Sequence, residues 1–207
     1  MIHPHTAKIL EELKLAVKAN ERASFIVSGG TSPKKIFNEL SDCDLDWARI
    51  DIALVDERKV QNNHPDSNEK MLKEELLIKK ATKANYISLL NETESVSSIK
   101  KPFDVVLLGM GEDGHFASLF PDHILQNHND IDSKSDPNIT YTKPLGQPRH
   151  ERISMNLSMI LRAKKIYLLV SNQEKLDVLE KSITDSSFPV FYLINQNKVT
   201  VEILGQD

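Results

Sequence analysis

The stretch of the sequence best suited to chemistry is residues 107–121, Leu-Leu-Gly-Met-Gly-Glu-Asp-Gly-His-Phe-Ala-Ser-Leu-Phe-Pro. Residues 103–108 are almost all apolar, which predicts a buried strand that ends in a glycine-rich turn bearing Asp113 and His115. Glycines let a backbone approach a ligand closely, and a histidine can exchange a proton near neutral pH. The turn therefore predicts proton-transfer chemistry by His115, oriented by Asp113. Taken alone, it is also compatible with a plain turn and a solvated histidine.

A second glycine-rich turn, Ser-Gly-Gly-Thr-Ser-Pro at residues 28–33, follows the apolar residues 24–27. Ser32 is suited to the N-cap and Pro33 to the first position of the helix that follows. Gly29, Gly30 and Thr31 are then expected where a helix presents unpaired N–H groups and the positive end of its dipole, which predicts an anion cradle. The third glycine of a dinucleotide motif and the Gly-Lys-Ser/Thr of a P-loop are both missing. A tight turn without a ligand is the alternative.

A third cluster, Asp56-Glu57-Arg58, follows a predicted strand at residues 49–55. We expect Arg58 to face a crevice at the strand end, where its planar guanidinium suits bidentate phosphate recognition and Asp56 or Glu57 can hold it in place. The alternative is a surface ion pair of little energetic value.

The elements that must position these turns alternate between strands and helices. Strands are predicted at residues 24–27, 49–55, 86–90, 103–108, 164–170, 188–194 and 198–204. Helices are predicted at 6–19, after Pro33, after a capping box at 66–69 and after 171–175, with 92–100 a polar helix or loop. This order predicts an α/β fold, a mainly parallel sheet with helices on both faces. Parallel strands end along the same edge, so the three turns are expected to converge.

The polar residues 122–152 are expected to form a loop-rich excursion from a single domain that spans residues 1–207. Residues 122–138 read as mobile, and a second loop at 142–152 carries Arg149 and Arg152. His123 and His128 are interleaved with acidic residues but share no helix face, so no metal site is expected there.

Composition limits the class of protein. The 207 residues are 40% hydrophobic and 27% charged, as in soluble globular proteins. A net charge of -4 predicts no nucleic-acid or membrane partner, so an anion site must be local. Cys43 is the single cysteine and excludes an internal disulfide, while the lack of a signal peptide or a long apolar run favours the cytoplasm.

The motifs together resemble the 6-phosphogluconolactonase family. The resemblance lies in residues 28–33, in Asp56-Glu57-Arg58 followed by His64-Pro65-Asp66-Ser67-Asn68, and in residues 108–121, while residues 149–153 and 171–175 are similar to the later phosphate-side motifs of that family. It implies the glucosamine-6-phosphate deaminase/ribose-5-phosphate isomerase-like fold. It also implies cytoplasmic hydrolysis of 6-phospho-D-glucono-1,5-lactone to 6-phospho-D-gluconate in the oxidative pentose phosphate pathway, with no cofactor.

The resemblance also suggests roles for individual residues. His115 would be the general base, oriented by Asp113, and backbone N–H groups around Gly109–Gly111 or Gly29–Gly30 would stabilise the oxyanion. The remaining residues expected to bind the sugar phosphate are Thr31, Asp56, Arg58, Arg152 and Lys175. The expected partner is a small sugar phosphate, and the chain is expected to be a monomer or a weak homo-oligomer.

Two alternatives remain. An amino-sugar phosphate isomerase or deaminase needs a further carboxylate soon after the Asp-Gly-His, where residues 116–120 hold no acid, and Arg58 stands where that sister family usually has Tyr. A non-catalytic sugar-phosphate sensor is a third possibility, against which the intact Asp113 and His115 pair argues.

Overall fold

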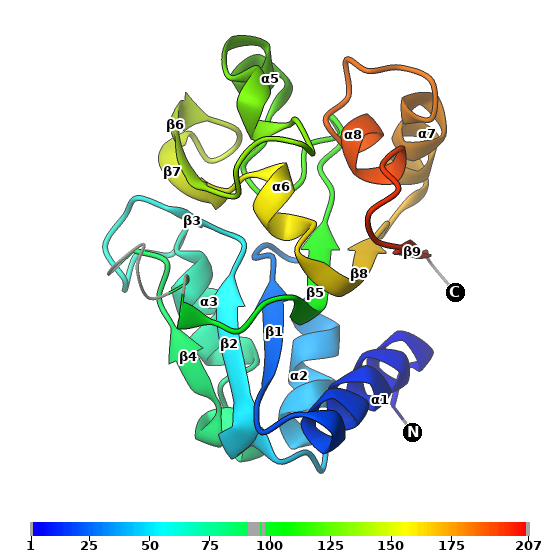
Figure 1. Cartoon of the computed structure of the whole chain (residues 1–207). Helices are drawn as coiled ribbons and strands as arrows, with labels where there is room; N and C mark the ends of the chain where they lie inside the picture. The colour runs from blue at the N-terminus through cyan, green and yellow to red at the C-terminus, as the bar shows by residue number, and fades with distance from the viewer. Residues whose placement is uncertain (1, 91–95, 97, 206–207) are drawn as a thin grey trace.

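The computed structural model describes residues 2–90, 96 and 98–205, and six parallel strands form its central sheet (Figure 1). In sheet order these strands are β4 (Asn85–Ile87), β2 (Ile50–Leu54), β1 (Ala23–Val27), β5 (Phe103–Gly109), β8 (Ala163–Leu169) and β9 (Val201–Leu204). Successive side chains of β1 point to opposite faces, and Phe25 and Val27 join one core while Ile26 joins the other. Both faces are therefore buried, which explains why the strands are apolar throughout.

Three helices cover the first face of this sheet. They are α1 (Pro4–Ala19), α2 (Lys34–Asp42) and α3 (Asn68–Glu75), with short 3-10 turns η1 (Trp47–Arg49) and η2 (Lys79–Lys83) beside them. Ile9 and Leu13 of α1 and Phe37 of α2 are fully buried in the core on this side. The spacing of four residues between Ile9 and Leu13 places both on one stripe of α1.

The second face carries the helices of the C-terminal half. These are α6 (Leu157–Ile160), α7 (Gln173–Ser182) and α8 (Val190–Ile194), and Leu157, Leu179 and Leu193 join the core on this side. The predicted parallel sheet with helices on both faces is confirmed. No helix in the described ranges has the length and apolar character needed to cross a membrane.

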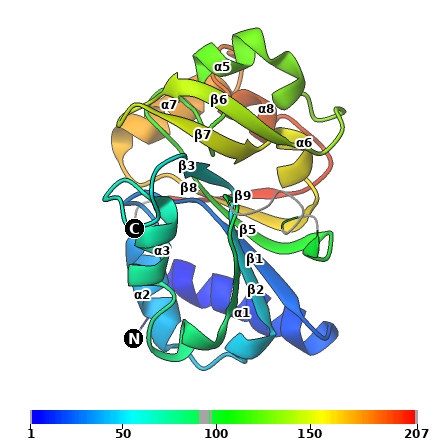
Figure 2. The ribbon, with the colours of Figure 1, turned by 90° about the vertical axis from the view of Figure 1, so that its left-hand side faces the viewer.

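A separate antiparallel sheet lies beyond the carboxyl end of β2 (Figure 2). It consists of β3 (Asp56–Arg58), β7 (His150–Met155) and β6 (Ile139–Leu145). Val55 is the branch point, because its N–H donates to Val27 O at 2.9 Å in the first sheet while its carbonyl accepts from Met155 N at 2.8 Å in the second. Asp56-Glu57-Arg58 is thus a strand of its own, whereas the sequence suggested only the polar end of the preceding strand.

The stretch 122–152 holds more regular structure than its composition suggests. Helix α5 (Pro121–Gln126) and the 3-10 turn η3 (His128–Asp130) are joined by the buried His123, whose Nε2 lies 2.8 Å from Asp130 Oδ2. Thr140 Oγ1 donates to the same carboxylate at 2.7 Å. The expectation of a loop at 142–152 is wrong, because these residues lie mostly in the β6–β7 hairpin, whose ladder hydrogen bonds a polar composition does not reveal.

Two other local expectations are also wrong. Residues 188–194 were expected as a strand but contain α8, because a short apolar run does not distinguish a buried strand from a buried helix and Pro189 favours a helix start. Ser32 does not cap α2, which begins at Lys34 with Pro33 in the cap position and no side-chain cap. Of the predicted polar segment 92–100, residues 92–95 and 97 lie outside the described residues.

Candidate functional site

The three turns singled out in the sequence converge on one cavity of about 270 Å³ at the carboxyl ends of the parallel strands. It is lined by Ser28, Gly29, Gly30, Thr31, Ser32, Asp56, Arg58, Asn68, Gly109, Met110, Gly111, His115, Ala117, Gln147, Arg152 and Lys175. Every candidate site residue from the sequence lines this cavity except Asp113, which contacts it through His115.

The turn after β5 is tightly closed. The N–H of Gly111 donates to His115 O at 2.9 Å, and the N–H of Gly114 donates to Gly111 O at 3.1 Å. A Cβ on Gly111 would lie 2.2 Å from the His115 ring, and Gly114 has a φ of +75°. Both positions therefore require glycine, the first for space and the second for its backbone conformation.

His115 and Asp113 form a hydrogen-bonded pair at the rim of the cavity. His115 Nδ1 lies 2.5 Å from Asp113 Oδ1, and the same oxygen accepts the backbone N–H of His115 at 3.2 Å. Burial alone would raise the pKa of Asp113, but the contacts with His115 outweigh burial and lower it. The anionic carboxylate fixes a proton on Nδ1 and leaves Nε2 as the nitrogen that can accept one. Phe120 supports the imidazole, with ring centroids 4.2 Å apart.

Arg58 and Arg152 stand directly opposite each other on the neighbouring strands β3 and β7. Arg58 is held by Asn68 Oδ1 at 2.7 Å and Asp66 O at 2.9 Å, and not by the carboxylates of Asp56 or Glu57 as the sequence suggested. Arg152 is buried, and its guanidinium lies 4.0 Å from the Asp56 carboxylate. Burial lowers the pKa of Arg152 and the charge of Arg58 adds to this effect. The carboxylates of Asp56, Glu57 and Asp66 oppose this shift. The two guanidinium groups nevertheless line the cavity side by side, where an anionic ligand could contact both.

Lys175 supplies positive charge from another part of the cavity wall. Its Nζ lies 3.3 Å from Ser171 Oγ and 3.4 Å from Ser32 Oγ, and burial lowers its pKa. Its hydrogen-bond partners in the structure are thus neutral hydroxyl groups, which leave the ammonium charge available to a ligand. Arg149, by contrast, is exposed, donates to Pro144 O and does not line the cavity.

Sequence reasoning missed the residues that hold the site together. The buried Glu57 carboxylate accepts the N–H groups of Asn68 and Glu69, which begin α3, and the hydroxyl of Ser67. Burial raises the pKa of Glu57, although these hydrogen bonds oppose the shift. The Asn68 side chain, fixed in this way, donates to Asp56 O and packs against Gly29. Glu57 belongs to the charged cluster that the sequence shows at residues 56–58. The sequence does not reveal that its partners are residues 67–69, for which it predicts only a helix cap.

Two other cavity residues, Ser28 and Gln147, were also missing from the site residues expected from the sequence. The Ser28 hydroxyl is buried without a hydrogen-bond partner, and so is Arg58 Nε. Gln147 reaches the cavity from the β6–β7 turn, where no feature of the sequence marks it. Buried polar atoms without a partner destabilise a fold. Ser28 Oγ and Arg58 Nε belong to residues in the wall of the cavity, where a polar ligand could form hydrogen bonds with them.

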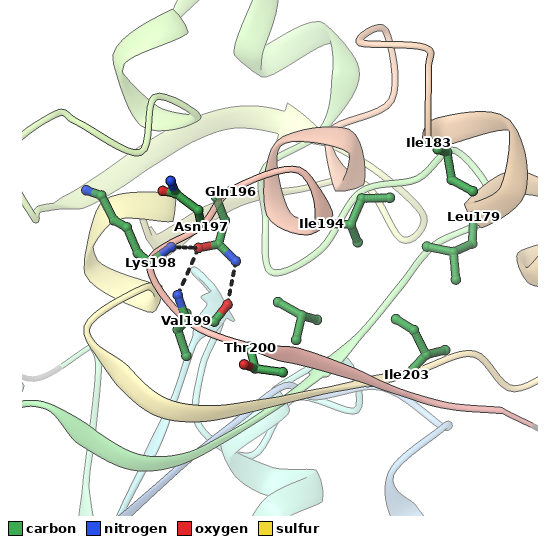
Figure 3. A pocket seen from close by; sticks show the side chains of 10 residues that line it. Leu179, Ile183, Ile194, Gln196, Asn197, Lys198, Val199, Thr200 and Ile203 are labelled. Atoms are coloured by element: carbon green, nitrogen blue, oxygen red, sulfur yellow. Dashed lines mark hydrogen bonds between the residues drawn. The ribbon is translucent and has the colours of Figure 1, made fainter.

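A larger hollow of about 540 Å³ lies elsewhere, between β9 and helices α7 and α8 (Figure 3). Its walls are mostly apolar, with Leu179, Ile194 and Ile203 among them. Lys198 is its single titratable residue, so it holds no acid and base pair.

The fold and the cavity define a class of α/β protein with a cavity at the ends of parallel strands, lined by three cationic side chains and by a histidine paired with an aspartate. A family model described as "Glucosamine-6-phosphate isomerases/6-phosphogluconolactonase" matches residues 1–201. The chain belongs to this family.

Similar proteins agree with this assignment. A 6-phosphogluconolactonase of Helicobacter pylori is 36% identical over 96% of this chain and 90% of its own, and one of Neisseria meningitidis is 34% identical over 94% and 90%. The crystal structure of a 6-phosphogluconolactonase from Shewanella baltica is similar with a TM-score of 0.88, at 33% identity over 98% of this chain and 91% of the other. The fold expected from the resemblance is therefore confirmed.

Proposed function

We propose that this chain hydrolyses 6-phospho-D-glucono-1,5-lactone to 6-phospho-D-gluconate, a reaction of the oxidative pentose phosphate pathway. The 6-phosphogluconolactonases to which it is similar along nearly its whole length support this activity. The observation that carries the proposal is the His115 and Asp113 pair in the same cavity as three cationic side chains.

The proposed reaction begins when His115 Nε2 takes a proton from a water molecule as the water oxygen attacks C1 of the lactone. The bond between C1 and the ring oxygen then breaks, and the protonated imidazole returns its proton to that oxygen. Asp113 holds the ring and balances its positive charge in between. One positioned base gives about 10²–10⁴-fold acceleration, and orientation of the substrate adds to it.

Arg58, Arg152 and Lys175 are the proposed ligands of the 6-phosphate. Asp56 supports them by placing its carboxylate between Ser118, whose hydroxyl donates to it at 2.6 Å, and Arg152. Fixed guanidinium and ammonium groups favour a phosphate dianion and orient the far end of the substrate.

The oxyanion that forms at C1 needs N–H donors. The N–H of Gly111 is already bonded to His115 O, so it does not serve. We therefore propose the backbone around Gly29 and Gly30, with Thr31 beside them, for this role in place of the Gly111 N–H. We further propose that the reaction takes place in the cytoplasm, without a cofactor, in a monomer or weak homo-oligomer that binds neither nucleic acid nor membrane.

His115→Ala tests the proposal. We expect it to lower kcat by at least about 10²-fold, because the general base is lost, while the affinity for 6-phosphogluconate stays close to that of the wild type. The measurement is a coupled assay on freshly generated lactone, corrected for spontaneous hydrolysis. Unchanged turnover would refute the role of His115, and ammonia release from glucosamine 6-phosphate would favour the isomerase and deaminase alternative.

A further inference from the structure

Three residues next to the cavity form a second cluster with a different chemistry. His64 and Asp66 lie in the loop between β3 and α3, and His150 is the first residue of β7. One donor atom from each lies within 4.8 Å of the other two. This cluster is distinct from His123 and His128, for which no metal site is expected from the sequence.

The distances fit a tetrahedral ion. His150 Nε2 lies 2.8 Å from Asp66 Oδ2, and His64 Nδ1 lies 3.7 Å from the same oxygen. Neighbouring ligands of Zn²⁺, each about 2.0–2.1 Å from the metal, are about 3.3 Å apart at a tetrahedral corner. The two distances lie on either side of that value, so small rotations of the side chains bring both nitrogens to it.

The three side chains are also accessible and able to move. They are between 24% and 39% exposed, which leaves a path for an ion and room for a water as fourth ligand. His64 Nδ1 now accepts the N–H of Asp66 at 3.1 Å, and His150 shares a proton with the Asp66 carboxylate. Metal ligation would replace these two hydrogen bonds, each of which contributes little at a solvent-exposed site.

We propose that His64, Asp66 and His150 bind a divalent transition-metal ion, Zn²⁺ being the best match to two imidazoles and one carboxylate. The ion links the β3–α3 loop to the start of β7. The carbonyl of Asp66 accepts a hydrogen bond from Arg58, and β7 carries Arg152, so the bound metal braces the two segments that present the arginines. The site is a structural accessory to the cavity and takes no part in the proposed hydrolysis.

Titration of the metal-free protein with Zn²⁺ in a calorimeter, followed by thermal unfolding, tests this proposal. The wild type is expected to bind one equivalent at this site and to unfold at a higher temperature when loaded. The double variant His64→Ala with His150→Ala is expected to lose this Zn²⁺ binding. Asp66→Asn is expected to lower the affinity for Zn²⁺ at least tenfold, since even a residue that only supports a ligand typically contributes about 10–100-fold to affinity.

The chain offers a matched control in another histidine pair. His3 and His5 lie at the start of α1 with their rings 4.7 Å apart. His3→Ala with His5→Ala removes as many imidazoles and is expected to leave the bound equivalent and the thermal shift intact. The proposal is overturned if the wild type binds no Zn²⁺, if the His64 and His150 double variant still binds it, or if Mg²⁺ competes equally well.

Discussion

Gly111 is the residue that fixes how closely the catalytic turn folds on itself. Its Cα faces the His115 ring and the Asp113 carboxylate, and a Cβ there would lie 2.2 Å from the first and 2.8 Å from the second. The pair can keep its short hydrogen bond only if position 111 has no side chain. The sequence suggested that this glycine gives room to a ligand, whereas in the structure it gives room to the side chains of His115 and Asp113.

Gly111→Ala is therefore expected to displace His115 and to lower kcat at least about tenfold, since a misplacement of about 1 Å can reduce a rate 10²-fold. Gly205→Ala is the control, because a Cβ there meets nothing within 4 Å and Gly205 does not line the cavity. Steady-state kinetics of both variants, with circular dichroism to verify folding, make the comparison. Equal losses in the two variants would contradict the steric argument.

Asp51 shows how one side chain links three elements. It lies on β2 and accepts hydrogen bonds from Arg22, just before β1, and from Asn85 on β4, at distances down to 2.6 Å and 2.8 Å. Partial burial would raise the pKa of Asp51, but these hydrogen bonds outweigh it and the pKa is lowered. The carboxylate therefore stabilises the fold above its unfolded pKa of about 4, and this stabilisation is lost as the pH falls through the lower folded value.

We predict that Asp51→Asn lowers the free energy of unfolding by an amount that depends on pH. We expect the free energy of unfolding at pH 7 to fall by about 0.5–1 kcal/mol, a modest value because Arg22 is largely exposed. The difference between the two proteins should begin to narrow as the pH falls below about 4, and it should close once the pH has passed the lower folded pKa of Asp51, where the wild-type carboxyl is neutral in both states. Urea unfolding across this range measures it, with the exposed Asp44→Asn as control. A gap that stays constant down to pH 3 would show that the charge is not responsible.

Much of the architecture could be predicted from local patterns. Apolar strands followed by glycine or charge identified β1, β5 and the cavity turns, because burial on both faces of a parallel sheet produces a simple sequence signal. Contacts between distant segments could not be predicted in this way. The pairing of β3 with β7, the capping of α3 by Glu57 and the position of Gln147 each depend on partners far along the chain.

At the scale of the whole molecule, charge is divided between the surface and the site. The net charge is -4, yet the cavity presents Arg58, Arg152 and Lys175. The surface as a whole repels an anionic substrate while the cavity attracts it. The local field dominates within the distance over which salt screens charges, about 8 Å at physiological ionic strength.

We therefore expect KM to rise with ionic strength between about 0.01 and 0.15 M, over which the screening length falls from about 30 to about 8 Å, with kcat nearly constant. Lys175→Met should make this dependence less steep. Lys181→Met, an exposed position on the same helix, should leave it unchanged. A salt dependence identical in all three proteins would mean that Lys175 does not contact the anion.

The hydrogen bond from Val190 N to Gly114 O, 2.9 Å long, has a consequence for biosynthesis. Phe188 packs against the same glycine, so the loop bearing His115 is supported by α8 and the residues just before it. During translation, residue 115 leaves the ribosome some 75 residues before this support does. In the nascent polypeptide, the loop that bears His115 therefore lacks this support until α8 has also been synthesised and has folded against it.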